Sequence, residues 1–242
     1  MSPASQHPVA ILYALEAEGA ELEAAIQEPR ERMEGGKRFL LGTVSGTPVA
    51  LGRMGIGKVA ASLTTAMAIE RLCVRAAVVI GTAGALHRSI RVGDVVIARQ
   101  TIQHDLGVRE GRRMETDPSL SQALSEVAGQ AVPASRVHHG TILTGDRACF
   151  TWRRRLRLRW AFRHEKPLVV EMEGAAAGYV AASLGVPFAA VRVASDHAGP
   201  LALVEFRRHL ALVAPLPGRV VLRWLAMGGN LFPSAGEAAR RP

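Results

Sequence analysis

The chain has 242 residues, 48% of them hydrophobic and 21% charged, and it carries no signal-peptide pattern and no apolar run of membrane-spanning length. These features exclude a transmembrane helix and argue against secretion, so we expect a cytoplasmic protein with one large core. The formal net charge of +9 raises the question of a nucleic acid or an anionic membrane as a partner.

No tract rich in Pro, Gly or Ser divides the chain, and no sequence period repeats. We therefore expect a single domain over residues 1–227 and a flexible tail over residues 228–242. Cys73 and Cys149 lie far apart in apolar surroundings, which is typical of reduced packing residues.

Apolar runs of strand length alternate with stretches of helical spacing along the chain. The strand-like runs cover residues 9–14, 39–44, 48–53, 76–80, 95–103, 136–143, 168–170 and 188–194. The helical stretches begin near residue 21 and then cover residues 59–72, 118–129, 175–184, 203–213 and 219–227. This alternation, with one early hairpin, predicts an α/β protein whose mixed, mostly parallel sheet is covered by helices on both sides.

Three turns after the early strands have a composition that suits a ligand. The first strand ends in acids, among them Glu18. The glycine-rich turn 54–58 precedes a helix, and its backbone amides suit an anion or sugar hydroxyls. The turn expected at 81–85 contains Thr82, Ala83 and Gly84, whose small side chains let a ligand lie against the backbone.

The histidines do not form a pattern typical of a metal site. For His104, at the end of a strand, a structural hydrogen bond is favoured because no second His or Cys stands at ligand spacing. His138 and His139 are neighbours in a predicted strand and therefore point to opposite faces. We expect neither a metal nor another cofactor.

The segment 152–166 holds most of the excess positive charge, with six arginines interleaved with Leu156, Leu158, Trp160 and Phe162. Its helical pattern is only loosely amphipathic, so we interpret it as a solvated face. We expect no nucleic-acid binding, because no second basic element with base-stacking aromatics accompanies it. The alternative, which we do not favour, is a helix on a membrane surface, since Arg with Trp, Phe and Leu is the composition of such helices.

The stretch 169–196 has the most site-like pattern in the chain. It is interpreted as a strand, a helix and a second strand, a right-handed βαβ unit. Glu171 and Glu173 follow the first strand, and Ser195 and Asp196 end the second. In such units the ligand crevice lies at the carboxyl ends of the strands, so the acids are expected to converge there. A Glu at a helix start or an Asp in a turn also occurs for purely structural reasons.

The chain resembles the nucleoside phosphorylase superfamily and, within it, the methylthioadenosine/S-adenosylhomocysteine nucleosidases. The stretches that carry the resemblance are 14–18, 55–60, 81–86, 92–96, 104–105, 144–146, 170–173 and 191–196, in the family's order and spacing to about residue 206. The resemblance implies a three-layer α/β sandwich that cleaves the N-glycosidic bond of a purine nucleoside, usually as a homodimer. For these nucleosidases it also implies a place in methionine salvage.

The resemblance also implies roles for single residues. Asp196 would protonate the purine N7, and Glu173 would hold the ribose hydroxyls. Met172 would pack at the sugar, Thr82 would lie near the base, and Arg192 would brace the acids. Cleavage of the glycosidic bond requires such groups independently of the resemblance. The departing purine must be protonated, and the cationic sugar needs a carboxylate and a nucleophile.

One departure from the family concerns the purine subsite. The nucleosidases place an aromatic and then an aliphatic residue after Gly145-Asp146, whereas this chain has Arg147, Ala148, Cys149 and then Phe150. Either Phe150 substitutes through a shift of the loop, or the pocket takes another substrate. A lipid-linked adenosine of the hopanoid type is one alternative.

Three functions are weighed. The first is hydrolysis of a 5′-substituted adenosine of the methylthioadenosine or S-adenosylhomocysteine type, which releases adenine. The second is a phosphate-dependent phosphorylase, which would include the lipid-linked substrate. The third is a basic protein that binds nucleic acid or a membrane surface on this fold, and it is disfavoured because clustered carboxylates do not help to bind an anion.

The choice between water and phosphate rests on Glu18. The phosphorylases that this chain resembles bind phosphate with one arginine after the first strand and another before a middle glycine-rich turn. Here Glu18 and Ile80 stand near those positions, and Arg53 is the one neighbouring cation. An acid repels a phosphate dianion and accepts a proton from water, so we expect hydrolysis, with Glu18 and Asp196 as the catalytic pair.

Overall fold

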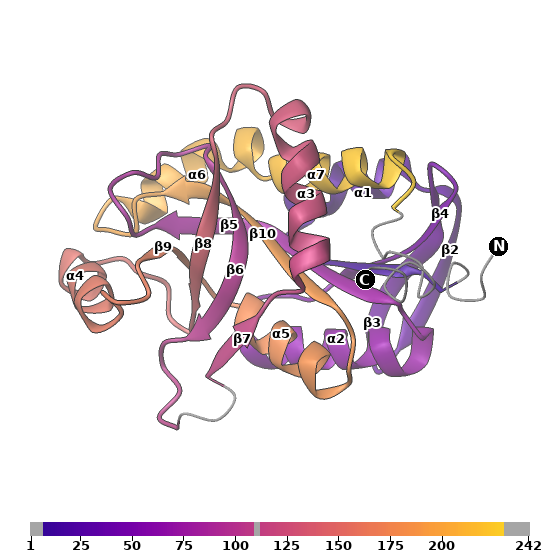
Figure 1. Cartoon of the computed structure of the whole chain (residues 1–242), viewed down its shortest axis with the longest axis horizontal. Helices are drawn as coiled ribbons and strands as arrows, with labels where there is room; N and C mark the ends of the chain where they lie inside the picture. Colours follow the sequence, from indigo (N-terminus) through magenta and orange to yellow (C-terminus); the bar gives the residue numbers. More distant parts are fainter. Residues whose placement is uncertain (1–6, 109–111, 230–242) are drawn as a thin grey trace, which may run out of the picture.

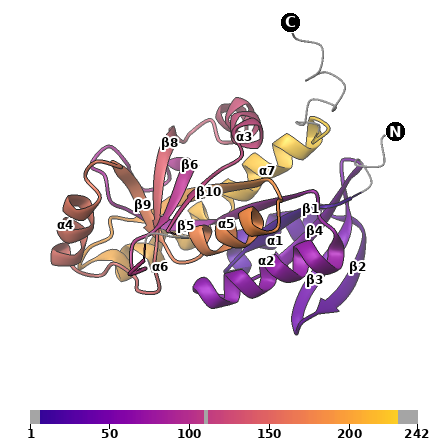
Figure 2. The same ribbon diagram turned by 60° about the horizontal axis from the view of Figure 1, so that its bottom comes forward.

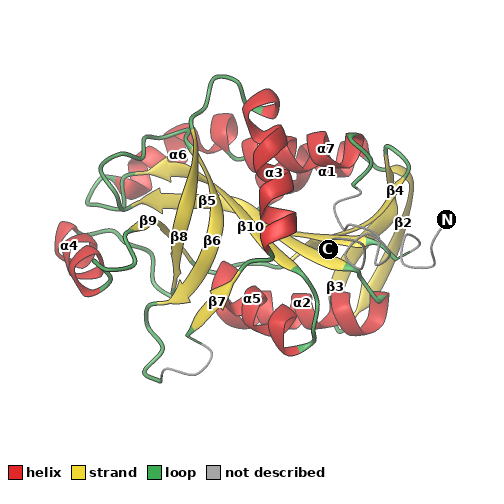
Figure 3. Ribbon diagram, in the orientation of Figure 1, coloured by secondary structure: helices red, strands yellow, loops and turns green. Residues whose placement is uncertain are grey.

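The computed structural model describes residues 7–108 and 112–229. The strands are β1 (Val9–Tyr13), β2 (Gln27–Glu34), β3 (Lys37–Val44), β4 (Thr47–Arg53), β5 (Ala76–Ala85), β6 (Val95–Gln103), β7 (Arg113–Glu115), β8 (Val137–Thr144), β9 (Pro167–Glu171) and β10 (Phe188–Asp196). The helices are α1 (Glu16–Ala25), α2 (Lys58–Leu72), α3 (Pro118–Ala131), α4 (Trp152–Ala161), α5 (Gly174–Ser183), α6 (Ala202–Val213) and α7 (Leu216–Ala226) (Figures 1 and 3).

One mixed sheet contains these strands in the order β10-β6-β8-β9-β5-β1-β4-β3-β2, with β7 beside β6. Strand β10 also pairs with β5, so the pairings of β10, β6, β8, β9 and β5 close into a ring. The antiparallel partners are β10–β6, β5–β9, β6–β7, β2–β3 and β3–β4. The predicted mixed sheet is confirmed, with a larger antiparallel share than the sequence indicated.

Helices cover both faces of the sheet, as predicted (Figures 1 and 2). Along β1, Ile11 packs on the side of α1, α3 and α7, where Trp224 is the largest fully buried side chain. The alternate residue Leu12 packs on the side of α2 and α5. The side chains on both faces of β1 are apolar because helices cover both faces of the sheet. None of the described helices is long and apolar enough to cross a membrane.

The predicted βαβ unit is wrong in its pairing, although its strands and helix exist. Strands β9 and β10 do not pair with each other, and both pair with β5 near its end, where Gly84 lies opposite Val170 of β9 and Asp196 of β10. Strand β9 is antiparallel to β5 and β10 is parallel to it. The two acidic strand ends therefore meet through β5.

Other differences concern strand lengths and exposure. Residues 81–85, predicted as a turn, continue β5. Strand β2 was not predicted, because its residues are charged and almost wholly exposed and carry no apolar alternation. Cys73 is exposed at the end of α2, so the prediction of a packing residue is wrong there, whereas Cys149 is buried. Of the predicted flexible tail, residues 230–242 lie outside the described residues.

Candidate active site

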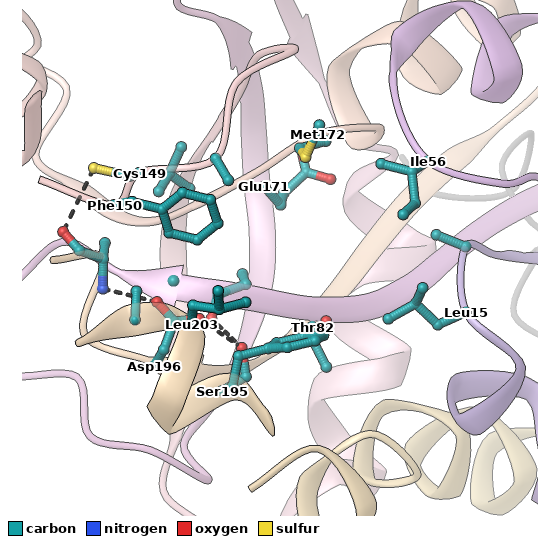
Figure 4. A pocket seen from close by; sticks show the side chains of 18 of the residues that line it. Leu15, Ile56, Thr82, Cys149, Phe150, Glu171, Met172, Ser195, Asp196 and Leu203 are labelled. Carbon is teal, nitrogen blue, oxygen red and sulfur yellow. Dashed lines mark hydrogen bonds between the residues drawn. The ribbon is translucent and has the colours of Figure 1, made fainter. Parts of the chain in front are cut away.

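A cavity of about 280 Å³ opens where β5, β9 and β10 end (Figure 4). Every site residue predicted from the sequence lines it except Arg192, which lies buried behind it. The predicted residues on the wall are Glu18, Thr82, Ala83, Gly84, Phe150, Glu171, Met172, Glu173, Ser195 and Asp196. Segments far apart in the sequence therefore share one cavity, whose volume lies near the lower end of the range for small-molecule sites.

Asp196 ends β10 and is only 8% exposed. Its Oδ1 accepts a hydrogen bond from the Ala198 amide at 2.8 Å, and its Oδ2 accepts one from the Ser195 hydroxyl at 2.8 Å. Burial raises the pKa of Asp196, and these two hydrogen bonds oppose the rise only in part. Gly84 is required here, because a Cβ on it would lie 2.9 Å from Asp196 Oδ1. Asp196 is thus a buried carboxyl group that faces the cavity and keeps its proton more readily than an exposed one.

Glu18 lies in the first turn of α1 and is 3% exposed. Its Oε1 accepts from the amide and the hydroxyl of Thr82, at 2.8 and 2.9 Å. Its Oε2 accepts from the amides of Ala14 and Leu15, at 3.0 and 2.9 Å. Both oxygens act as acceptors, as they do in an ionised carboxylate. These contacts fix Glu18 at the junction of β1, α1 and β5.

Glu171 forms an ion pair with Arg192, and both side chains are almost fully buried. Glu171 also accepts hydrogen bonds from the Thr144 hydroxyl and from the Gly174 amide at the start of α5. Arg192 donates to the carbonyl of Ile80 at 2.8 Å. Burial opposes the charge of Arg192, but the neighbouring acids raise its pKa overall. Because Glu171 pairs with the buried Arg192 and holds the start of α5, its geometry is that of a positioning residue.

Glu173 directly precedes α5 and faces the cavity with 5% exposure. Its Oε2 lies 3.6 Å from Arg192 Nη2, and its Oε1 accepts from the Gly57 amide at 2.9 Å. Burial, and then the charge of Glu171, raises the pKa of Glu173 to about 7. The carboxyl groups of Glu171 and Glu173 thus share one guanidinium.

The composition of the glycine-rich turn before α2 suits an anion or sugar hydroxyls, and in the structure its amides bind carboxylates of the protein itself. Gly57 donates to Glu173, and the Lys58 amide donates to Asp146 at 3.0 Å. The Lys58 ammonium lies 2.8 Å from Asp105 and 3.4 Å from Asp146. This network ties the start of α2 to the ends of β6 and β8, so the helix N-terminus is already neutralised.

The histidines lie outside the cavity wall. His104 Nε2 is buried with no hydrogen-bond partner among residues 7–108 and 112–229, so that atom does not make the predicted bond. His138 lies 3.0 Å from Asp94, and His139 lies 3.3 Å from Ser125. Within the described ranges no three His, Cys, Asp or Glu residues are arranged to hold a metal ion.

Part of the cavity wall was not predicted from the sequence. The loop after β8 contributes Arg147, Ala148 and Cys149, and Cys149 Sγ lies 3.5 Å from the Ala198 carbonyl oxygen (Figure 4). Helix α6 contributes Ala202, Leu203 and Phe206. The unusual sequence after Gly145-Asp146 marked the loop, but nothing in the helical pattern of α6 marked it as part of a site.

The fold and the site define a class of α/β enzyme in which strand ends from one sheet deliver carboxyl groups to a single cavity. The chain belongs to the Phosphorylase superfamily, whose sequence profile matches residues 8–226. It is 30% identical to the 5′-methylthioadenosine/S-adenosylhomocysteine nucleosidase of Mycobacterium bovis, over 90% of this chain and 96% of that one.

Two solved structures extend this similarity. The methylthioadenosine/S-adenosylhomocysteine nucleosidase of Colwellia psychrerythraea, in complex with adenine, superimposes with a TM-score of 0.87 at 29% identity, over 93% of this chain and 96% of that one. The futalosine hydrolase of Helicobacter pylori gives a TM-score of 0.85 at 27% identity, over 91% and 98% of the two chains.

Proposed function

We propose that the protein hydrolyses the N-glycosidic bond of a 5′-substituted adenosine of the methylthioadenosine/S-adenosylhomocysteine type and releases adenine. The observation that carries the proposal is the placement of Asp196 and Glu18 on the wall of one cavity. The similarity over nearly the whole chain to hydrolases of such nucleosides supports it.

Asp196 supplies the acid that the leaving group needs. A purine anion is a poor leaving group, so a proton must reach it as the carbon–nitrogen bond breaks. The buried carboxyl of Asp196 has a raised pKa and therefore retains such a proton closer to neutral pH. Ser195 and Ala198 hold the carboxyl in one orientation.

Glu173 and Met172 bind the sugar, and Glu18 activates the nucleophile. Glu173 presents a carboxyl to the cavity beside Met172, where it can accept hydrogen bonds from ribose hydroxyls. Glu18 faces the same cavity, and the Thr82 hydroxyl bonded to it is the donor that a bound water can replace. Its carboxylate then takes a proton from the water that attacks the cationic sugar carbon.

Water is favoured over phosphate because the cations and amides near Glu18 are already occupied. Arg53 lies 3.6 Å from Glu16 and outside the cavity wall. The Gly57 amide binds Glu173, and Arg192 binds Glu171. Arg147 also lines the cavity, on the loop after β8, but it makes no ion pair or hydrogen bond to Glu18 among the described contacts. A phosphate dianion next to Glu18 would meet a carboxylate whose hydrogen-bond partners are backbone amides and the Thr82 hydroxyl, and not a cation.

The experiment is a panel of adenosines that differ in the 5′ group, with released adenine as the readout. Methylthioadenosine, S-adenosylhomocysteine and an adenosine with a bulky apolar 5′ group are compared at equal concentration. We expect release from at least one of the first two, with Glu18→Gln and Asp196→Asn nearly inactive. Adenine release from none of the panel, or full activity of both variants, would refute the proposal.

We also propose that the protein is a homodimer that acts in the cytoplasm, in methionine salvage. Ile56, in the turn before α2, is 62% exposed and also lines the cavity, and Val59 and Leu63 on α2 are 84 and 42% exposed. A second copy on this apolar side would bury it and complete the cavity. Light scattering should give a dimer for the wild type and a monomer for Val59→Lys; a monomeric wild type would refute the dimer. The proposed cytoplasmic location is supported by the free thiols of Cys73 and Cys149, because a reducing compartment keeps cysteines unpaired.

A further inference from the structure

Helix α4 is held to the protein by one side only. Leu158 and Phe162 belong to a small buried cluster. Arg154 donates to the carbonyl of Arg147 at 3.4 Å, and Arg155 donates to that of Leu86 at 3.3 Å. At 100° per residue these four side chains occupy one side of the helix. The opposite side therefore points away from the protein, at the end of the molecule farthest from β2 (Figures 1 and 2).

That outward side carries an apolar stripe. Trp152, Leu156 and Trp160 follow one another at intervals of four residues, which places them in one row along a helix. Their exposures are 57, 51 and 70%. The sequence pattern was interpreted as a solvated face, but the structure exposes the tryptophans as well as the arginines. Exposed apolar side chains grouped in this way are typical of an interaction surface.

Arginines flank the stripe on the same side. Arg153 and Arg157 are exposed, and Arg163 lies beyond the last turn. The guanidinium of Arg153 lies 5.6 Å from the ring centroid of Trp152, and that of Arg163 lies 5.0 Å from that of Trp160. None of the ion pairs among the described residues involves these three arginines. The acid within 152–166, Glu165, pairs with Arg113.

We propose that α4 docks the protein on an anionic phospholipid surface, with the row Trp152, Leu156 and Trp160 in the headgroup region and the flanking arginines on lipid phosphates. Tryptophan and arginine around an apolar row are the side chains that hold a helix in the plane of a membrane interface. Each basic residue adds attraction to anionic lipid.

Other occupants fit this face less well. A nucleic acid would satisfy the arginines but would leave the apolar row against a charged backbone. A second copy related by twofold symmetry would bring the same arginines face to face. The neutral apolar side of α2 is the better surface for a second copy. The docking proposal is independent of the reaction that the cavity supports.

The test measures binding of the full chain to phosphatidylcholine vesicles with and without phosphatidylglycerol. We expect co-sedimentation only with the anionic vesicles, and a blue shift of tryptophan emission on binding. The third tryptophan of the chain, Trp224, is 1% exposed, so the shift reports the two on α4. Trp152→Ser with Trp160→Ser should weaken binding by on the order of tenfold or more. Met33→Ser, which removes an exposed apolar side chain from β2 at the other end of the molecule, should leave binding unchanged.

Two double variants with the same change in net charge distinguish docking through α4 from general electrostatic attraction to the vesicle. Arg153→Gln with Arg157→Gln should weaken binding by about twenty-five-fold, from about fivefold for each basic residue. Arg30→Gln with Arg71→Gln lowers the net charge equally, far from α4, and should have little effect. Adenine release by all variants checks that the site is intact.

Equal binding by both charge variants, or no binding to anionic vesicles, would overturn the proposal. Conversion of a dimer to a monomer by the tryptophan substitutions would also overturn it and would assign the face to a second copy. Retention on RNA or DNA that the tryptophan variant loses would assign the face to nucleic acid instead.

Discussion

Asp196 is the residue on which the proposed chemistry depends most. We expect Asp196→Asn to bind a substrate analogue with near wild-type affinity and to lose about 10²- to 10⁴-fold in kcat, because an amide cannot donate the proton that the purine needs. The amide oxygen of asparagine can still accept from the Ala198 amide, so the local fold is retained. Calorimetric binding and the rate of adenine release measure the two effects separately. Unchanged turnover would rule out Asp196 as the acid.

Glu173 should make stability depend on pH in a definite direction. Its pKa is raised to about 7 from 4.5, so between these values the folded chain keeps a proton that the unfolded chain has lost. The stabilisation from this group is fully present below pH 4.5 and is lost as the pH rises through 7. Glu173→Gln mimics the protonated form at every pH. Its stability relative to wild type should therefore increase from pH 5 to pH 8, by up to about 3 kcal/mol.

Urea unfolding of both proteins at several pH values measures this difference. Glu21→Gln is the matched control, because Arg219 lowers the pKa of Glu21 and the Glu21 carboxyl is therefore ionised in both states over that range. A difference between Glu173→Gln and wild type that stays constant from pH 5 to pH 8 would contradict the raised pKa.

At the scale of elements, the Glu171–Arg192 pair joins β9, β10 and the start of α5. Removing one partner leaves the other charge buried, so we expect Glu171→Gln to lower the free energy of unfolding by about 3 to 5 kcal/mol. The exposed pair Arg113–Glu165 provides the comparison, and Glu165→Gln should cost about 1 kcal/mol or less. Equal effects of the two substitutions, measured by urea unfolding, would show that the buried pair does not join these elements.

The sequence predicted the elements better than their pairing. Acids at the ends of apolar runs correctly marked strand ends, because a charged group rarely continues a buried strand. The relation of β9 to β10 could not be predicted, since both pair with β5 and neither contains a signal for that register. Strand β2 was not predicted, because an exposed strand of charged residues lacks the alternation of apolar and polar residues that marks a buried face.

The site, like the fold, could be predicted only where the sequence itself carries a signal. Every predicted site residue lies on or directly behind the cavity wall. The acids were identified by their type and their place at strand ends, whereas Met172, Phe150 and Arg192 came from the resemblance to the nucleosidases. Leu203 and Phe206 were missed because only the tertiary fold brings α6 to Asp196. For the glycine-rich turn, the sequence indicated an anion or sugar hydroxyls at its amides, and in the structure these amides bind the carboxylates of Glu173 and Asp146.

At the scale of the whole molecule, the ring of strands and the adjoining β1 bring Glu18, Glu173 and Asp196 to one cavity, and α4 leaves a basic and apolar face at the end of the molecule (Figure 2). The superfamily profile alone does not specify whether water or phosphate is the nucleophile. Near the cavity, the distinction follows from Glu18 and from the pairing of Arg53 with Glu16, of Arg192 with Glu171 and of the Gly57 amide with Glu173.

The most direct test of this account is the identity of the sugar product. Methylthioadenosine is incubated with the protein in water labelled with heavy oxygen, with and without inorganic phosphate, and the products are analysed by mass spectrometry. We expect adenine release at the same rate in both conditions and a free sugar that carries one labelled oxygen. Adenine release that requires phosphate and yields a sugar 1-phosphate would contradict the assignment of Glu18 as the base that activates water.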